Sequence, residues 1–281
     1  ITELLSTQGN LTDELQTRID NATSKLELED IYLPYRPRRR SPAAKARAAG
    51  LDVAAQAVLT QEITPTDALA DYQVQSSITD DSGNEIEVDF SDITKQLAGV
   101  QAIIVDEWTQ ALALLDNLRS GFAKTASIVS AVASEEKREV GEKFKDYFEH
   151  SESLARLPNH RLLAMLRGRQ ENVLGLKIEG EDAPFIEKII KHFEIDSKAP
   201  DARQEFLTEA ATSLWKDKWR PHIEHRLLTA KRLTAEADAI DVFANNLQHL
   251  LMSAPAGRKV ILGVDPGIRH GVKMAIVDAQ G

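Results

Sequence analysis

The chain has 281 residues, of which 42% are hydrophobic, 28% charged and 5% aromatic, so it can bury a core and is not disordered throughout. It has no cysteine, which excludes disulfides, thiolate metal sites and a cysteine nucleophile. The sequence contains neither a run of about 18 apolar residues nor a secretory signal pattern, and we expect a soluble cytoplasmic protein. Because aromatic residues are few, the core must rest mainly on aliphatic side chains, which favours helices over an all-β fold.

The formal net charge of −10 is unevenly distributed along the chain. Residues 31–51 contain six basic residues and no acid, whereas residues 52–94 contain ten acids and no base. An acidic protein is unsuited to nonspecific nucleic-acid binding over its whole surface. One basic patch is still compatible with this composition.

Helix signals recur through the first 72 residues. Ser24 and Glu27 have the spacing of a capping box, and the helix that they start must end by about Tyr32, before two prolines. Ser41–Pro42 and Thr64–Pro65 each combine an N-cap with a proline in the first helical position. They predict two further helices, the first ending at residue 50 and the second near residue 72.

The middle of the chain mixes helix and strand signals. Residues 73–90 have a turn-rich acidic tip and predict an exposed loop or a short hairpin. Residues 91–119 predict a long helical stretch, interrupted at Gly99, with an apolar face. After it we expect strands at 125–132 and 172–179, with helices at 135–149, from 158 to about 168, and at 184–193.

The last third has the most regular pattern. Residues 201–219 predict a helix, and residues 222–252 contain no glycine or proline, which predicts a helix about 46 Å long. Its apolar stripe includes Ile223, Ile240 and Phe243. Residues 255–257 end it, and residues 259–277 then have the period of two strands around a glycine-rich turn.

Two motifs suggest chemistry. In the base-rich segment, Tyr32 and Tyr35 could stack on bases while the arginines at 36–40 contact phosphate. Composition alone favours a proline-stiffened linker whose arginines pair with the acidic stretches on either side.

The second motif is Asp265, which follows a strand and precedes a glycine-rich turn, as the first metal-binding carboxylate does in ribonuclease-H-like folds. A two-metal site needs further carboxylates from other strands, so a turn-forming Asp is the simpler interpretation.

Two weaker signals have ordinary structural explanations. Arg161, Arg167 and Arg169 form a second modest basic cluster, which a solvated helix face explains. Trp215 and Trp219 lie four residues apart on one helical face, which is more typical of a core than of a ligand platform.

Three segments resemble the Tex family of bacterial transcription accessory proteins. Residues 28–39 (LEDIYLPYRPRR) resemble the family's N-terminal signature, and residues 160–169 (HRLLAMLRGR) resemble a second family segment. Residues 245–257, followed by residues 263–267 (GVDPG), resemble the family's approach to a YqgF-like, ribonuclease-H-like domain. The three segments occur in the family's order over nearly the whole chain.

The resemblance implies a mainly α fold, with a helix-turn-helix-like element and a long central helix, ending in the first β-hairpin of a YqgF-like domain. It also implies that the chain is part of a longer protein, whose helix-hairpin-helix elements and oligonucleotide-binding barrel lie outside it. We accordingly expect four parts: a Tex-type N-terminal helical region at 1–90, a helical middle region with short strands at 91–200, long central helices at 201–256 and the start of the YqgF-like domain at 257–281.

The function implied by the resemblance is that of a non-enzymatic transcription accessory factor. It would bind RNA or single-stranded nucleic acid, mainly through domains outside this chain, and associate with the transcription machinery, without a cofactor, metal or small-molecule substrate. The implied YqgF-like domain is catalytically degenerate, which leaves Asp265 without a catalytic role. We expect a secondary nucleic-acid contact from five basic side chains, Arg36, Arg38, Arg39, Arg40 and Lys45.

Two alternatives belong to other functional classes. In the first, the chain is a protein-interaction module that docks on RNA polymerase or on the remaining domains and binds no nucleic acid. In the second it is a nuclease that uses Asp265, which would need carboxylates that this chain does not supply.

Overall fold

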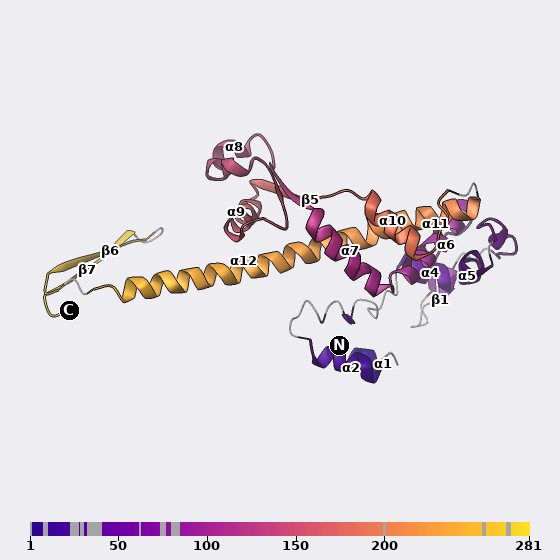
Figure 1. Ribbon diagram of the computed structural model, residues 1–281, viewed down its shortest axis with the longest axis horizontal. Helices are drawn as coiled ribbons and strands as arrows, with labels where there is room; N and C mark the ends of the chain where they lie inside the picture. Colours follow the sequence, from indigo (N-terminus) through magenta and orange to yellow (C-terminus); the bar gives the residue numbers. More distant parts are fainter. Residues whose placement is uncertain are drawn as a thin grey trace. The chain divides into compact units, whose positions relative to one another are not determined.

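The computed structural model describes residues 2–7, 11–22, 28, 31–32, 41–61, 63–73, 77–79, 85–198, 201–254, 257–267 and 271–281. The chain divides into two compact units, Ile1–Arg232 and Leu233–Gly281. The first unit is mainly helical with a few short antiparallel strands, and the second consists of the later turns of a long helix and one β-hairpin (Figure 1). The prediction of a mainly α fold is therefore confirmed.

The N-terminal helices are short. α1 (Thr2–Thr7) and α2 (Asp13–Asp20) contribute Leu5 and Leu15 to a small apolar cluster that also contains Ile31. Thr12 caps α2 by accepting a hydrogen bond from the backbone N–H of Leu15 at 3.2 Å. The predicted capping box at residues 24–27 lies outside the described residues.

The helical body of the first unit packs its helices around an aliphatic core. Leu51, Ile103, Ile104 and Leu118 are buried with 0 to 1% exposure. This part contains α4 (Pro42–Ala48), α5 (Asp52–Thr60), a 3-10 turn η2 (Asp67–Leu69), α6 (Ile93–Trp108), α7 (Leu112–Thr125), α10 (Ala183–His192) and α11 (Ala202–Ser213).

Local capping signals place the starts of two of these helices where the sequence predicted them. The Ser41 hydroxyl accepts from the backbone N–H of Ala44 at 3.1 Å, and Pro42 occupies the first turn of α4. The Asp92 carboxylate likewise accepts from the N–H of Lys95 at 3.0 Å at the start of α6. These caps satisfy backbone donors that a helix start leaves without intrahelical partners.

Gly99 is part of a continuous α6, so the predicted interruption there is wrong. A Cβ at this position would lie 2.6 Å from Leu51 Cδ1 and 2.9 Å from Phe90 Cε1, so glycine allows neighbouring elements to approach closely. The helical stretch ends instead at Thr109, whose hydroxyl donates to the Asp106 carbonyl oxygen at 2.6 Å. α7 begins three residues later, without a glycine or proline at the break.

A three-stranded antiparallel sheet forms a lobe of the first unit. Its strand order is β4-β3-β5, with β3 (Ser127–Val132) between β4 (Glu149–Ser153) and β5 (Leu174–Glu179). α8 (Lys137–Val140), the 3-10 helix η3 (Glu142–Tyr147) and α9 (Asn159–Gln170) belong to the same lobe (Figure 1). Phe144, Phe148, Val173 and Leu174 form a buried cluster within it.

Several sequence-based boundaries in the first unit need correction. The helix predicted from Thr64 to about Tyr72 reduces to η2, and the helix predicted at 135–149 is divided into α8 and η3. β4 was not predicted, because its sequence EHSES lacks alternating apolar residues. It is a strand because it pairs with β3 as a sheet edge, which is a nonlocal interaction. Of the two alternatives for residues 73–90, the short hairpin is confirmed by the antiparallel pairing of β1 (Ser77–Thr79) with β2 (Glu85–Glu87), and the acidic tip at 80–84 lies outside the described residues.

The long C-terminal helix begins after a π-helical turn. α11 leads into η4 (Leu214–Trp219), a π-helix, and then into α12 (Arg220–Leu251), with Pro221 in its first turn. Proline is tolerated there, since the preceding backbone is already irregular. Trp215 is fully buried and stacks on Phe185 with ring centroids 4.8 Å apart, as the core interpretation of the Trp pair predicted.

In the second unit, the later turns of α12 precede a β-hairpin. β6 (Ile261–Gly267) and β7 (Gly271–Val277) pair antiparallel from Ile261 opposite Val277 to Gly267 opposite Gly271. Every residue of both strands is exposed. Gly271 has a φ of +74°, a backbone conformation that suits glycine at the end of a turn.

Candidate functional site

The structure describes only part of the basic segment that the sequence analysis selected. Arg36, Arg38, Arg39 and Arg40 lie outside the described residues. Lys45 lies midway along α4 and is half-buried, and it forms no ion pair with a residue that the structure describes.

Arg47, on the same helix as Lys45, has an internal partner. Its Nη1 lies 2.7 Å from Asp106 Oδ2 on α6. This base of the 31–51 stretch is therefore neutralised within the fold. The pairing that the linker interpretation predicts for the arginines at 36–40 lies outside the described residues.

Asp265 lies on an exposed strand of the second unit. Its side chain is 75% exposed, and its Oδ2 atom is 3.9 Å from Lys273 Nζ on the opposite strand. In the described part of the chain, no three His, Cys, Asp or Glu side chains are grouped so that they could hold a metal ion. The arrangement around Asp265 is that of a loose surface ion pair, which contributes little to stability.

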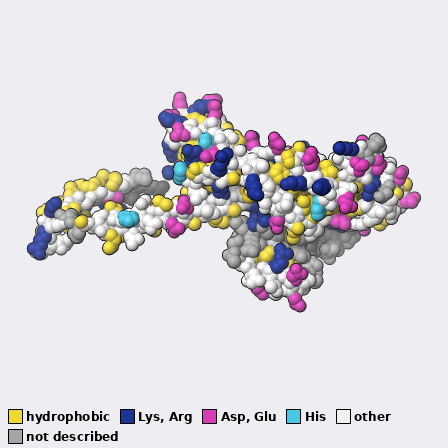
Figure 2. Space-filling model, viewed as in Figure 1, with side chains coloured by type: hydrophobic (Ala, Val, Ile, Leu, Met, Phe, Trp, Pro, Cys, Tyr) yellow, Lys and Arg dark blue, Asp and Glu magenta, His cyan; other side chains and the backbone are white. Residues whose placement is uncertain are grey.

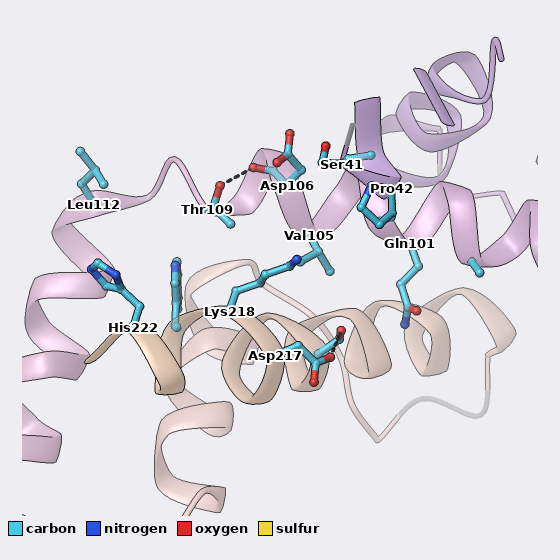
Figure 3. A pocket seen from close by; sticks show the side chains of 15 residues that line it. Ser41, Pro42, Gln101, Val105, Asp106, Thr109, Leu112, Asp217, Lys218 and His222 are labelled. Carbon is cyan, nitrogen blue, oxygen red and sulfur yellow. Dashed lines mark hydrogen bonds between the residues drawn. The ribbon is translucent and has the colours of Figure 1, made fainter. Parts of the chain in front are cut away.

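A hollow of about 420 Å³ lies between α4, α6 and the η4–α12 junction (Figure 3). Lys218 extends from the junction toward Val105 on α6, and Ser41 lies at the other side of the hollow (Figure 3). The carboxylate of Asp217 accepts from Ser213 Oγ at 2.6 Å. Ser41 and Pro42, at the start of α4, line this hollow.

A second hollow, of about 660 Å³, lies between the sheet lobe and the start of α12. Its apolar floor includes Ile128 of β3, Ile178 of β5 and Leu228 of α12. Charged side chains surround this floor, and we call the hollow the basic groove after its basic members, Arg169, Lys177, Lys216, Arg220 and His225.

Arg220 organises one wall of the basic groove. Its Nη1 donates to Asp182 Oδ1 at 2.6 Å and its Nε donates to Glu224 Oε1 at 2.8 Å. Asp182 Oδ1 also accepts from the indole N–H of Trp215 at 2.6 Å. Burial disfavours the charged guanidinium, but the hydrogen bonds that it donates to Glu224 and Asp182 outweigh this effect, so the pKa of Arg220 is raised.

The modest basic cluster of the sequence analysis separates into paired and unpaired members. Arg161 Nη1 lies 3.1 Å from both carboxylate oxygens of Glu152, and Arg167 Nε lies 3.1 Å from Glu171 Oε1. Burial favours a protonated Glu152, but its hydrogen bonds with Arg161 and His150 lower its pKa. Arg169 has no ion-pair partner in the described part of the chain and faces the basic groove.

Sequence reasoning therefore missed the basic groove, apart from Arg169. Arg169, Lys177 and Lys216 lie on α9, β5 and η4, and no local motif connects them. The only available signal was the basic cluster at 161–169. The lone positive charges at positions 177 and 216 are ordinary in any surface sequence.

Comparison with known proteins agrees with the motif resemblance. Residues 66–243 match the family model described as Tex central region-like. The chain is 39% identical over 289 residues to "Protein YhgF" of Escherichia coli (strain K12), with 100% of this chain and 36% of that protein aligned. It is 36% identical over 282 residues to "Transcriptional accessory protein Tex" of Neisseria gonorrhoeae, with 98% of this chain and 35% of that protein aligned.

A more distant relative is found outside bacteria. The chain is 26% identical over 280 residues to "S1 RNA-binding domain-containing protein 1" of Homo sapiens, with 96% of this chain and 27% of that protein aligned. The chain thus spans about a third of the length of the two bacterial relatives and about a quarter of the length of the human one. Since the family model covers residues 66–243, well over half of its length, the chain belongs to the Tex family.

Proposed function

We propose that this chain is the helical scaffold of a nucleic-acid-associated transcription accessory factor, acting by binding and positioning and not by catalysis. The observation that carries the proposal is the alignment of 98% of the chain with a relative named as a transcriptional accessory protein. The name of the human relative, which refers to an S1 RNA-binding domain, supports RNA or single-stranded nucleic acid as the binding partner. Such a protein would act in the cytoplasm, and no described helix is long and apolar enough to cross a membrane.

The part of this function that we assign to the chain itself is a secondary contact through the basic segment. Arg36, Arg38, Arg39, Arg40 and Lys45 would approach phosphate groups, supported by the excess of basic residues over 31–51 and by the absence of an ion pair at Lys45 among the described residues. The larger share of affinity would come from domains outside this chain. We also propose that β6 and β7 begin a YqgF-like domain in which Asp265 has no catalytic role. We further propose that the chain has four parts, at residues 1–90, 91–200, 201–256 and 257–281.

The alternative is a protein-interaction module that docks on RNA polymerase or on the rest of the full-length protein. The ion pair between Arg47 and Asp106 favours it, because it neutralises one base of the 31–51 stretch internally. If the other arginines are paired in the same way, the segment has little charge left for phosphate.

Binding of a labelled oligouridylate across a salt series tests the proposal. Each phosphate contact to a single strand contributes a log–log salt slope of about −0.7. The combined variant Arg38→Ala, Arg39→Ala and Arg40→Ala should therefore weaken binding and reduce the slope by about 2. A matched control removes three exposed bases elsewhere, with Arg156→Ala, Lys191→Ala and Lys198→Ala. Absence of binding at low salt, or equal affinities of the two triple variants, would favour the interaction module.

A further inference from the structure

Four basic side chains converge on the basic groove from different elements. Arg169 is in the last turn of α9, Lys177 is in β5, Lys216 is in η4 and His225 is in the second turn of α12. All four side chains are exposed at the surface. Figure 2 shows Lys and Arg side chains, with acidic side chains among them, on the viewed face of the first unit.

The acids of the groove do not neutralise these cations. Asp182 and Glu224 are its two carboxylates, and both accept hydrogen bonds from Arg220 at 2.6 and 2.8 Å. Arg169, Lys177 and Lys216 form no ion pair with any side chain in the described ranges. With four Lys or Arg side chains and two acids in its lining, and His225 counted as neutral, the groove carries a net charge of +2.

The shape and lining of the groove indicate which anion it accepts. Its volume of about 660 Å³ is in the range of a site for a small ligand or a short stretch of polymer. A duplex holds both of its backbones in a stiff double helix that a hollow of this size cannot enclose, so it would contact only the rim. The floor is aliphatic, with Ile128, Leu176 and Ile178, and no Phe, Tyr or Trp lines the groove among the described residues. The imidazole of His225 is the single aromatic ring among the described lining residues, so a strand would gain little from base stacking there.

We propose that the basic groove is a binding site for the phosphodiester backbone of a single-stranded nucleic acid, read by charge and independent of base identity. The site shares no residue with the segment at 36–45, and the inference rests on the proposed function only in taking nucleic acid as the partner. Three cations on three different elements hold their spacing through the fold. The groove would therefore bind a nucleic-acid strand along a path that the fold fixes. The basic segment differs, because its cations are neighbours in the sequence.

The test compares two charge-matched triple variants of the full 281-residue chain. The groove variant combines Arg169→Gln, Lys177→Gln and Lys216→Gln. The control variant combines Arg156→Gln, Lys191→Gln and Lys198→Gln, which removes the same charge from exposed positions outside the groove. Binding of fluorescein-labelled oligouridylate, oligoadenylate and a duplex RNA is measured by anisotropy across a salt series. Thermal unfolding of each variant provides a check that the fold is intact.

We expect the groove variant to bind both single strands about tenfold more weakly, with a salt slope smaller by about 2, while the control variant changes little. Oligouridylate and oligoadenylate should bind the unmodified chain with similar affinities, and the duplex should respond least to the groove variant. Equal loss in the groove and control variants would overturn the proposal. A strong preference of the unmodified chain for one of the two oligonucleotides would also overturn it. So would a polyglutamate probe that displaces the labelled RNA as well as unlabelled RNA does.

The variants also separate this inference from the proposed function. If the unmodified chain binds no nucleic acid at low salt, both fail. If it binds, and only the Arg38, Arg39 and Arg40 substitutions weaken binding, the proposed function stands and the groove is not a site. If the groove variant alone loses affinity, the groove replaces the basic segment as the contact.

Discussion

The two ends of α12 have similar apolar patterns but different surroundings. At its start, Ile223 is fully buried, and Trp219, just before the helix, is 3% exposed. In its later turns, Ile240, Phe243 and Leu250 are 66, 67 and 71% exposed. The apolar stripe in the sequence continues along both parts. An amphipathic pattern thus identifies the face that can be buried, whereas burial itself depends on what packs against that face.

The start of α12 is anchored by an aromatic and ionic cluster. Trp215 stacks on Phe185 and contacts Phe122 edge-on with ring centroids 5.7 Å apart, while its indole N–H donates to Asp182. Arg220 joins the same acid to Glu224 and lies 5.9 Å from the Phe122 ring centroid. If the comparison between the two parts of the helix is correct, substitutions in this cluster should cost far more stability than substitutions in the later turns.

The largest expected effect is that of Trp215→Ala. Removing a fully buried indole eliminates its packing and leaves a cavity, so the free energy of unfolding should fall by about 3–5 kcal/mol. Urea unfolding followed by far-UV circular dichroism measures this change. The control is Phe243→Ala in the exposed part of α12, which should change stability by about 0.5 kcal/mol or less. Similar losses of stability for the two variants would contradict the proposed difference between the buried start and the exposed later turns of α12.

A smaller effect is expected for Arg220→Met. The substitution keeps much of the side-chain volume but leaves two half-buried carboxylates, Asp182 and Glu224, without their cation. We expect a loss of about 1–3 kcal/mol in the same unfolding measurement. Arg167→Met removes a more exposed pair with Glu171 and should cost about 1 kcal/mol or less. If Arg220→Met costs no more than Arg167→Met, the ionic part of the anchor is unimportant.

The smallest effect concerns a surface cluster before α6. Hydrogen bonds from Lys95 and Ser91 lower the pKa of Asp89 to about 2. Since the folded-state pKa lies below its ordinary value of 3.8, the contribution to stability is present above that value and is lost as the pH falls toward 2. An NMR titration of Lys95→Gln should find the Asp89 pKa shifted upward, whereas Lys198→Gln should leave it near 2. An unchanged pKa in Lys95→Gln would assign the shift to Ser91.

Much of the candidate site could not be predicted because its residues are distant in sequence. Arg169, Lys177 and Lys216 meet only because α9, β5 and η4 pack around the start of α12. The pairing of Asp182 and Glu224 with Arg220 could not be predicted either, because these contacts also depend on the fold. It is this pairing that leaves Arg169, Lys177 and Lys216 without an acidic partner among the described residues. By contrast, the basic segment was easy to recognise, because six bases without an acid over 31–51 form a local signal.

The amino-acid sequence by itself determined the helix starts at Ser41 and Asp92, the two paired strands within 259–277, and the family, because capping, turn formation and motif identity depend on neighbouring residues. For residues 73–90 it left a loop and a hairpin as alternatives, and the pairing of β1 with β2 decided between them. Only the tertiary structure decided that the polar segment 149–153 is a strand and that Gly99 continues its helix. Hydrogen bonds between strands and close contacts between helices join residues far apart in the chain, and no local pattern records them.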